Sequence, residues 1–343
     1  MSSRPDLSIV VPVHDEEGNV GPLHRELTDV AQRLGGSYEL IFVNDGSTDR
    51  TLERLEELVT VDRHLRVIDL DGNFGEAAAL SAGFATALGA AVVTLDGDGQ
   101  NDPHDIPKLL ARLAEGYDAV SGRRLRRAED FTTRVLPSLV ANRLIALVTG
   151  VPVYDCGCGL KAYRRQLVAG ARLPRGMNRF LPAILGVDAT RVAEVETRDR
   201  PRGSGASHYG LSRLLVVLRD LFALPLLVRR PPAGQGTARA LRVGAALLLG
   251  LAGGAAWDAS RGIAAVAAAG AVVVATVASN VARFADAQME GVFRVRRTLD
   301  ASDPADILPE HRHRGSRVLG TESPADVRAT PWHATHDAVR SRS

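Results

Sequence analysis

The segment Asp96-Gly97-Asp98-Gly99-Gln100 has the residue types and the spacing of a site for a hard cation. Two carboxylates two residues apart can reach one cation, and Gln100 adds an amide oxygen from the same loop. Mg²⁺ or Mn²⁺ held by only a few protein oxygens keeps several waters and usually binds substrate phosphates. Because Asp-Gly pairs are also common in ordinary turns, the prediction of a metal site at Asp96, Asp98 and Gln100 depends on where this loop lies.

The elements predicted around the loop place it at the edge of a sheet. Up to about residue 122, short apolar runs alternate with amphipathic stretches, which is typical of β-α units with a mostly parallel sheet. The predicted strands are residues 7–13, 38–43, 65–70, 91–95 and 117–120. The predicted helices are residues 19–34, 48–61, 75–88 and 103–115, with Asn19, Asp49 and Asp102 as N-terminal caps. The loop therefore follows a strand, and ligands of such sheets bind beyond the C-terminal ends of the strands.

Two other predicted strands also end in acidic segments, His14-Asp15-Glu16-Glu17 and Asn44-Asp45-Gly46-Ser47. We expect the three segments to meet at one edge of the sheet, which strengthens the metal-site prediction. No Gly-x-Gly-x-x-Gly follows the first strand, and no Gly-x-x-x-x-Gly-Lys-Ser/Thr occurs in the chain. Both absences argue against a dinucleotide oxidoreductase and a P-loop NTPase, so phosphates must be held in another way.

The composition excludes several other classes of protein. With 343 residues, 45% of them hydrophobic, the chain can form a sizeable core, which excludes a disordered protein, a collagen and a disulfide-stapled mini-domain. A net charge of +2 is unusual for a dedicated nucleic-acid binder. The two cysteines, Cys156 and Cys158, are too few and too close for a disulfide framework, and no signal peptide is visible. Both features favour a reduced, cytosolic location for the globular part.

The second half of the chain changes in composition and predicts a membrane attachment. Two apolar stretches, residues 243–257 and 263–282, have arginines on both outer flanks, so the positive-inside rule places both ends of a hairpin in the cytoplasm. We expect a catalytic domain over residues 1–210, an interfacial helix and linker over 211–237, a transmembrane hairpin over 238–283 and a disordered cytoplasmic tail over 284–343. The alternative is a buried Ala-rich helical hairpin in a soluble protein.

The chain resembles the family-2 glycosyltransferases from Leu7 to about Val228, and six blocks of sequence carry the resemblance. Within that family they are most similar to the polyprenyl- or dolichol-phosphate sugar synthases, such as dolichol-phosphate mannose synthases. The blocks are residues 11–19, 43–49, 96–103, 121–124, 155–164 and 202–209. The resemblance implies an α/β fold of the GT-A (Rossmann-like) type that binds a nucleotide sugar. It also implies an inverting transfer of one sugar to a lipid phosphate.

The resemblance also implies which residues bind the donor nucleoside. Pro12, His14 and Glu16 would contact the nucleoside from the end of the first strand, and Val43 and Asp45 would bind the base and ribose. This chain departs from the family at His14, where a tyrosine is common, which changes any stacking on the base.

The diphosphate and the metal would lie at the third acidic segment. By the resemblance, Asp96, Gly97 and Asp98 meet the ribose and diphosphate, and Asp98 and Gln100, with Asp96, hold the Mg²⁺ or Mn²⁺. The basic donor-phosphate contacts would be Arg124, Arg202 and His208. His208 stands where the family commonly has lysine, so this contact would depend on pH, because histidine titrates near neutrality.

The implied mechanism requires little proton chemistry, because a polyprenyl phosphate is already anionic and nucleophilic. Asp98, Asp155 and Arg124 are the expected catalytic residues. Asp155 matches a family aspartate near the reacting centre, but capping of the turn at residues 156–159 explains it equally well. Arg127, Arg134 and Arg179 either hold the acceptor phosphate or are solvated arginines of an Arg-rich chain.

The sequence thus predicts an inverting glycosyltransferase. It would move a single sugar from a UDP- or GDP-hexose to a polyprenyl phosphate at the cytoplasmic face of the cell membrane, and a homo-oligomer is compatible with the resemblance. A catalytically degenerate nucleotide-binding membrane scaffold and a family-2 transferase with a different acceptor are the alternatives. A processive polysaccharide synthase is disfavoured because its Gln-x-x-Arg-Trp signature is absent. The sugar, the base and the polyprenyl length are left open.

Overall fold

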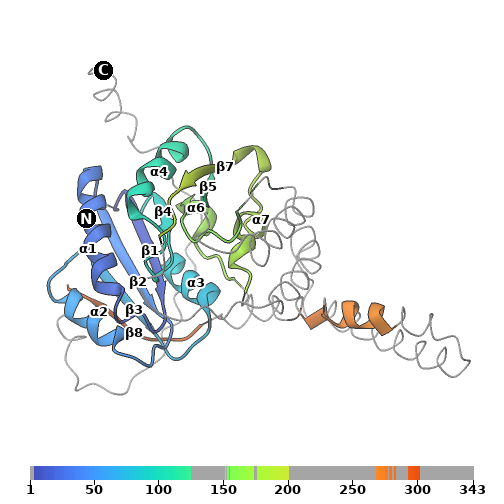
Figure 1. The fold of residues 1–343 in the computed structure, drawn as a ribbon, viewed down its shortest axis with the longest axis horizontal. Helices are drawn as coiled ribbons and strands as arrows, with labels where there is room; N and C mark the ends of the chain where they lie inside the picture. The colour runs from blue at the N-terminus through green and yellow to red at the C-terminus, as the bar shows by residue number, and fades with distance from the viewer. Residues whose placement is uncertain are drawn as a thin grey trace, which may run out of the picture.

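The computed structural model describes residues 4–124, 151, 153, 155–173, 176–200, 268–276, 278–279, 282 and 293–301. These residues form one eight-stranded sheet with helices on both faces (Figure 1). The strand order is β7-β5-β6-β4-β1-β2-β3-β8. The strands are β1 (Leu7–Val13), β2 (Tyr38–Asn44), β3 (Leu65–Leu70), β4 (Ala91–Thr94), β5 (Ala119–Arg124), β6 (Lys161–Arg164), β7 (Val192–Thr197) and β8 (Val295–Asp300).

The helices follow the strands along the chain as the β-α pattern predicts. The longer helices are α1 (Val20–Leu34), α2 (Thr51–Val59), α3 (Glu76–Thr86) and α4 (Ile106–Ala114). The short ones are η1 (Pro103–Asp105), α6 (Arg165–Val168), η3 (Asn178–Phe180), α7 (Leu181–Ile184) and η4 (Ala189–Arg191). Of the three predicted caps, Asp102 is confirmed, because its side chain accepts a hydrogen bond from the His104 backbone N–H. Asn19 makes no side-chain cap. The N-cap residue of α2 is Arg50, but the Asp49 side chain accepts a 2.9 Å hydrogen bond from the N–H of Thr51, the first residue of α2.

The central strands are buried on both faces, as expected for a parallel sheet covered by helices. β1 pairs in parallel with β2 and with β4, and all seven of its residues are buried. Val10 packs in the core on the α3 side, whereas Ile9 and Val11 pack in the core that includes residues of α1, α2 and α4. The mixed α/β architecture and the first five strands were thus predicted to within a few residues.

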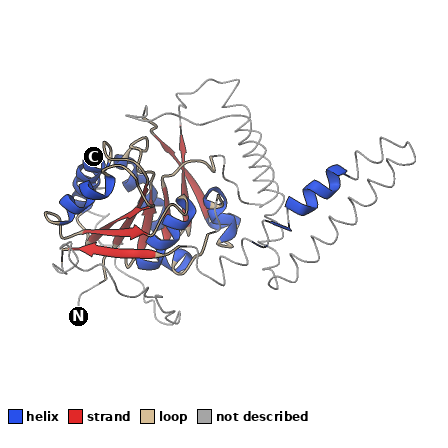
Figure 2. Cartoon of the chain, turned by 90° about the horizontal axis from the view of Figure 1, so that it is seen from below, coloured by secondary structure: helices blue, strands red, loops and turns tan. Residues whose placement is uncertain are grey.

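Three strands were not predicted, and each joins the sheet from a later part of the chain. β6 inserts antiparallel between β4 and β5, and β7 pairs in parallel with β5. β8 pairs antiparallel with β3, at the edge of the sheet (Figure 2). β8 corrects the expectation of a disordered tail from residue 284 onward, since residues 295–300 form a strand.

β8 escaped prediction because its residues are mostly polar. Leu299 is its one buried side chain, and its arginines face acidic partners on β3. Asp69 of β3 is fully buried and has Arg296 Nη1 at 3.3 Å and Arg297 Nε at 3.6 Å. Asp69 also accepts a 2.8 Å hydrogen bond from the Asn44 side chain. The strand is therefore held by charge compensation of a buried carboxylate as much as by apolar burial.

The predicted membrane segments lie largely outside the described residues. Residues 211–237 and the first apolar stretch, 243–257, are not described, whereas residues 268–276 of the second stretch are helical. Within the described ranges, no helix has both the length and the apolar character that a membrane crossing requires.

A glycine allows α3 to pack closely on β1. A Cβ atom at Gly83 would lie 2.3 Å from Val10 Cγ1, whereas a Cβ atom at Gly21 of α1 would meet nothing within 4 Å. We therefore expect Gly83→Ala to lower the free energy of unfolding by about 1–3 kcal/mol through overpacking. Gly21→Ala should raise it by up to about 1 kcal/mol, because alanine is the better helix former. Urea unfolding followed by circular dichroism checks both, and equal shifts for the two variants would contradict the packing argument.

Candidate functional site

The three acidic segments lie side by side, as predicted, because β4, β1 and β2 are adjacent and parallel. Their C-terminal ends meet at one edge of the sheet, where ligands of such folds bind. The acidic residues of this edge fall into two groups with different partners. The carboxylates of one group accept hydrogen bonds from backbone N–H groups of a neighbouring loop, and those of the other, Asp96 and Asp98, lie among further carboxylates.

The carboxylates after β1 and β2 join the two loops to each other. Asp15 has a left-handed backbone, with φ 54°, and its Oδ1 accepts a 2.6 Å hydrogen bond from the Thr48 N–H. Glu17 accepts from the Arg50 N–H at 3.1 Å, and the Glu17 N–H donates to Asp49 at the same distance. These acids stabilise the shape of the edge.

Asp45 fixes the beginning of α3 to the end of β2. Its two carboxylate oxygens accept hydrogen bonds from the Phe74 and Gly75 N–H groups, at 2.7 and 2.8 Å. The neighbouring Gly46 has φ +63°, and a Cβ atom there would lie 2.4 Å from the Gly72 carbonyl carbon, so the two loops touch. The structure thus gives Asp45 a positioning role, and its nucleoside contact stays a prediction.

The other predicted nucleoside residues lie around this junction. The ring of His14 is partly exposed; its Nδ1 is 2.9 Å from the Asp45 carbonyl oxygen and its Nε2 is 3.0 Å from Asn73 Nδ2. Glu16 is half-buried and accepts a 2.5 Å hydrogen bond from the Asn19 side chain. Pro12 and Val43 are buried. Asn73, which contacts His14 Nε2, was not predicted from the sequence as a residue of this region.

Asp96 and Asp98 form the second group of acids. Asp98 is buried and accepts a 3.1 Å hydrogen bond from the Gln100 N–H. Gly97 passes close under β1, since a Cβ atom there would be 2.8 Å from the Pro12 carbonyl oxygen. Gly159 lies against Asp96, with the position of its absent Cβ only 2.2 to 2.4 Å from the carboxyl group. Any side chain at residue 159 would displace that carboxylate.

The charge around Asp96 is strongly negative. Burial, followed by the charges of Glu76 and Asp98, raises the pKa of Asp96 to about 8, and the positive charges of Lys161 and Arg124 only partly oppose this. A raised carboxyl pKa means that the surroundings disfavour the ionised form, so a bound cation would stabilise the carboxylate. Its donor set consists of oxygens, which suits a hard divalent cation.

Arg124, at the end of β5, is held by Asp155. Nε of Arg124 is 2.8 Å from Asp155 Oδ2 and its Nη2 is 3.1 Å from Oδ1, which is a bidentate pair. Burial acts to lower the pKa of Arg124, but the hydrogen bond and charge of Asp155 outweigh it and raise the pKa. Asp155 is buried, and its own N–H donates to Glu194 at 3.0 Å. Its side chain therefore orients Arg124.

Residues that follow β7 form backbone hydrogen bonds with the loop that contains Asp96 and Asp98. Asn101 forms an isolated antiparallel bridge with Asp199, and the Arg200 N–H donates to the Gln100 carbonyl oxygen at 2.8 Å. The Asn101 side chain accepts from the Asp96 N–H at 3.2 Å. The backbone of the predicted metal loop thus depends on residues a hundred positions later.

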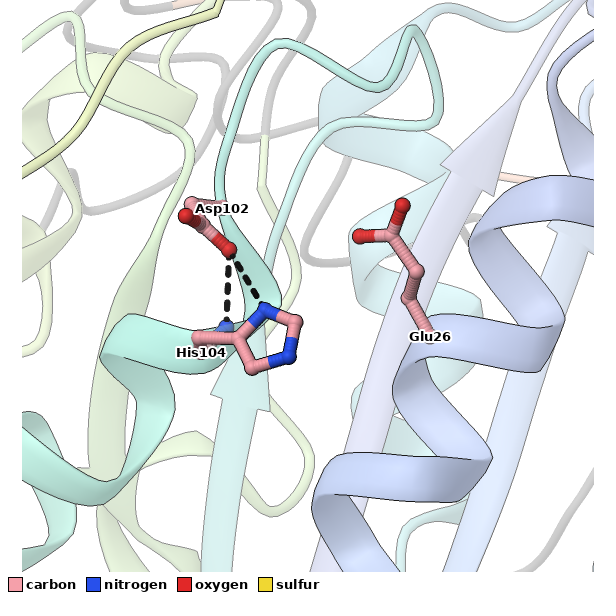
Figure 3. Close-up of side chains that lie close together, drawn as sticks. All are labelled: Glu26, Asp102 and His104. Atoms are coloured by element: carbon pink, nitrogen blue, oxygen red, sulfur yellow. Dashed lines mark hydrogen bonds and ion pairs between the residues drawn. The ribbon is translucent and has the colours of Figure 1, made fainter.

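Arg200 also joins this loop to α1. Figure 3 shows Glu26 of α1 reaching toward Asp102 and His104, whose ligand atoms all lie within 4.8 Å of one another. The Arg200 guanidinium donates to Glu26 at 2.8 Å and to Asp102 at 2.7 Å, so this group already contains a cation. Burial acts to raise the pKa of Asp102, but the hydrogen bonds from His104 and the charge of Arg200 outweigh it and lower the pKa. We therefore assign these residues a structural role.

A small pocket, partly open to solvent, adjoins Asp96 on the side of α3. Its polar walls are Asp96, Glu76, Lys161 and Asn178, and Glu76 accepts a 2.5 Å hydrogen bond from Asn178. Glu76, Lys161 and Asn178 were missed as site residues. Lys161 carried a signal, because it is one of only two lysines in the chain and belongs to the fifth block of the resemblance. Nothing in the sequence singles out Asn178.

The predicted basic residues are only partly described. Arg179 belongs to η3, next to Asn178 of the pocket wall. Arg127, Arg134, Arg202 and His208 lie outside the described residues. Both cysteines are free and buried, and burial raises the pKa of the thiols to about 11 for Cys156 and about 12 for Cys158.

Comparisons with known proteins place this site in a family. The sequence profile of "Glycosyl transferase family 2" matches residues 8–170. A dodecaprenyl-phosphate galacturonate synthase of Rhizobium johnstonii is 39% identical over 228 residues, which cover 65% of this chain and 68% of the relative. An undecaprenyl-phosphate 4-deoxy-4-formamido-L-arabinose transferase of Pseudomonas aeruginosa is 37% identical over 257 residues, 73% of this chain and 76% of the relative.

Among solved structures, glucosyl-3-phosphoglycerate synthase from Mycobacterium tuberculosis, in complex with Mn²⁺ and UDP-glucose, aligns with a TM-score of 0.51. It is 22% identical, over 67% of this chain and 81% of that chain, so the likeness concerns the fold alone. The described domain has the mixed α/β architecture of the GT-A fold. The profile match and the identity to two relatives over most of their length show that the chain belongs to glycosyl transferase family 2.

Proposed function

We propose that this protein transfers a single sugar, with inversion, from a nucleotide diphosphate sugar to a polyprenyl phosphate. The observation that carries the proposal is the end of β4, where Asp96 and Asp98 lie beside a pocket, with Arg124 and Lys161 close enough to act on the charge of Asp96. Two relatives have names that contain dodecaprenyl phosphate and undecaprenyl phosphate, which supports a polyprenyl-phosphate acceptor.

The donor set at this edge fits a divalent cation. Asp98 and Gln100, with Asp96, would hold Mg²⁺ or Mn²⁺, because all three offer oxygen ligands and the charges of Lys161 and Arg124 only partly offset the burial and the carboxylates around Asp96. When bound, the cation would neutralise charge that develops on the leaving nucleoside diphosphate. Carboxylate and amide oxygens accept either ion, so both remain candidates for the resident metal.

The residues of the chain contribute position and charge to the transfer. An oxygen of the acceptor phosphate forms a bond to the anomeric carbon while the bond from that carbon to the donor β-phosphate oxygen breaks, and the nucleoside diphosphate leaves. No proton has to move, because the acceptor oxygen is already anionic. Arg124, oriented by Asp155, stabilises negative charge on the diphosphate.

The remaining predicted contacts complete the proposal. Arg202 and His208 would bind the donor phosphates, and Arg127, Arg134 and Arg179 the acceptor phosphate. A hairpin within residues 238–283 would bring the catalytic domain to the cytoplasmic membrane face, where the lipid acceptor is available. Of these groups, Arg179 is the one that the structure describes, and its neighbour Asn178 lines the pocket.

The proposed reaction is tested by supplying detergent-solubilised protein with Mg²⁺ or Mn²⁺, undecaprenyl phosphate and a panel of UDP- and GDP-sugars. We expect release of nucleoside diphosphate together with a sugar-bearing lipid, and loss of both with EDTA. Asp98→Asn should lower the rate by at least about 100-fold, because it removes a charged ligand. Asp29→Asn, a change at an exposed residue of α1, is the matched control. Donor hydrolysis without lipid product would exclude the acceptor, and unchanged activity of Asp98→Asn would exclude the metal site.

Cation binding should depend on pH through Asp96. Its pKa is raised to about 8, so a proton competes with the cation below that pH. If one proton is displaced, the Kd for Mn²⁺ should fall roughly tenfold for each pH unit gained below the pKa, and level off above it. Titration with Mn²⁺ followed by electron paramagnetic resonance measures this. Asp96→Asn should bind more weakly and with a flatter pH profile, and a pH-independent Kd in the unmodified protein would contradict the assignment.

Arg200 should support cation binding without touching the cation. Arg200→Gln removes the guanidinium that joins Glu26 to Asp102, so the loop from Asp96 to Asp102 becomes less rigid. We expect the Kd for Mn²⁺ to rise about 5- to 50-fold, with a smaller change in KM for the donor at saturating metal. Arg198→Gln, an exposed neighbour, is the control and should change neither. Equal effects of the two variants would show that Arg200 is not a positioning residue.

A further inference from the structure

Lys161 is a buried ammonium group with unused hydrogen-bond donors. The residue is only 7% exposed, although lysine is among the residue types most rarely buried. Within the part of the chain that the structure describes, its Nζ makes one hydrogen bond, a long one of 3.3 Å to the Cys156 carbonyl oxygen, and no ion pair within 4.0 Å. An ammonium group has three donors, so two remain without a partner there.

Such an arrangement is costly unless a ligand completes it. Burial of a charged group with unsatisfied donors opposes folding, and proteins rarely keep one that is not paired. The other lysine of the chain shows the ordinary case, because Lys108 is exposed and forms an ion pair with Asp105. Since no described residue supplies the missing partner of Lys161, we expect a ligand to supply it.

The pocket determines from which direction that partner comes. Lys161 lines the small, partly open pocket that Asp96, Glu76 and Asn178 also line. Asp96 belongs to the proposed metal and diphosphate site, so the chemical group next to the diphosphate enters this pocket. That group is either the sugar of the donor or the phosphate of the acceptor that attacks it.

The surrounding charges favour a negatively charged oxygen at Lys161, provided that the metal site is filled. Without a cation, Glu76 and, when it is ionised, Asp96 place negative charge beside Lys161, which disfavours a further anion there. A divalent cation at Asp96 and Asp98 reverses this balance. A phosphate or carboxylate would then find an ammonium partner in a desolvated site, where charge-assisted hydrogen bonds are strongest.

We propose that Lys161 binds a substrate oxyanion other than the donor diphosphate, a phosphate or carboxylate oxygen that enters the pocket beside Asp96. The proposal rests on the proposed function for the identity of the substrates. The oxyanion has two possible sources, the phosphate of the polyprenyl acceptor and the carboxylate of a uronic sugar on the donor. Both present the same chemistry to the ammonium group, and the experiment distinguishes them.

The kinetic test compares Lys161→Met, Lys161→Arg and, as control, Lys108→Met. Methionine keeps the length of the side chain and removes its charge, so the fold is expected to persist, and arginine restores the charge. KM is measured for undecaprenyl phosphate and for two donor pairs that differ by one carboxylate: UDP-glucose with UDP-glucuronate, and UDP-galactose with UDP-galacturonate.

We expect Lys161→Met to raise KM roughly 10- to 100-fold for the substrate that carries the oxyanion and less than about 2-fold for the other. Lys161→Arg should recover part of this loss, and Lys108→Met should match the unmodified protein. A rise confined to undecaprenyl phosphate identifies the acceptor, and a rise confined to the uronic donors identifies the sugar carboxylate. Unchanged KM values for all substrates would overturn the proposal. So would a KM rise that is equal for the neutral and uronic donors and absent for undecaprenyl phosphate.

A binding measurement separates this inference from the proposed reaction. Because the chain has only two lysines, ¹³Cε-lysine labelling gives two side-chain signals, which the variants assign. In the presence of Mg²⁺, the Lys161 signal should shift with undecaprenyl phosphate or with a uronic donor, and the Lys108 signal should not. If no lipid product forms but the Lys161 signal shifts, the proposed reaction fails and the oxyanion site stands. If product forms and the signal is insensitive to every anion, the reaction stands and the oxyanion site fails.

Discussion

Repulsion between carboxylates at one edge of the sheet is the constraint around which the site is organised. The parallel strands β1, β2 and β4 end side by side, and each continues into acidic residues. Several of these acids, such as Asp15 and Asp45, accept hydrogen bonds from backbone N–H groups, and these bonds fix the loops. Asp96 is different, because burial, followed by the charges of two further carboxylates, raises its pKa. The loops are fixed where their carboxylates accept hydrogen bonds from a neighbouring loop, and a cation would bind at Asp96, where burial and other carboxylates raise the pKa.

The site is assembled from parts of the chain that are far apart in sequence. Asp155 orients Arg124, Gly159 leaves room for the Asp96 carboxylate, and Arg200 supports the backbone of Gln100. β6 is central to this, since it inserts next to β4 and carries Lys161 to the same edge as Asp96. The loop that contains Asp96 thereby adjoins a pocket whose lining includes both acidic residues and Lys161.

The sequence allowed much of the fold to be predicted, and the reason is physical. β1 is buried on both faces, so it appears as a continuous apolar run, and the amphipathic helices between the strands are equally visible. β8 has one buried residue, Leu299, and arginines that pair across the sheet, so no apolar pattern marks it. For the site, residue types and strand ends predicted Asp96 and Asp98. Asp45 was predicted as a ligand-binding residue, but its hydrogen bonds to α3 depend on a tertiary contact that no local pattern reveals.

β7 and β8 occupy the two opposite edges of the sheet. Residues 201–292 follow Arg200, which is bonded to Gln100, Glu26 and Asp102, and precede β8, so the chain is fixed to the domain on both sides of this segment. A membrane hairpin within the segment, as proposed, is thus tethered at two points rather than hanging from one flexible linker. Two points of attachment restrict how far the domain can tilt toward the bilayer. The catalytic edge would then meet lipid-borne phosphates in a limited range of orientations, and that restriction lowers the entropy lost when a lipid substrate is aligned for reaction.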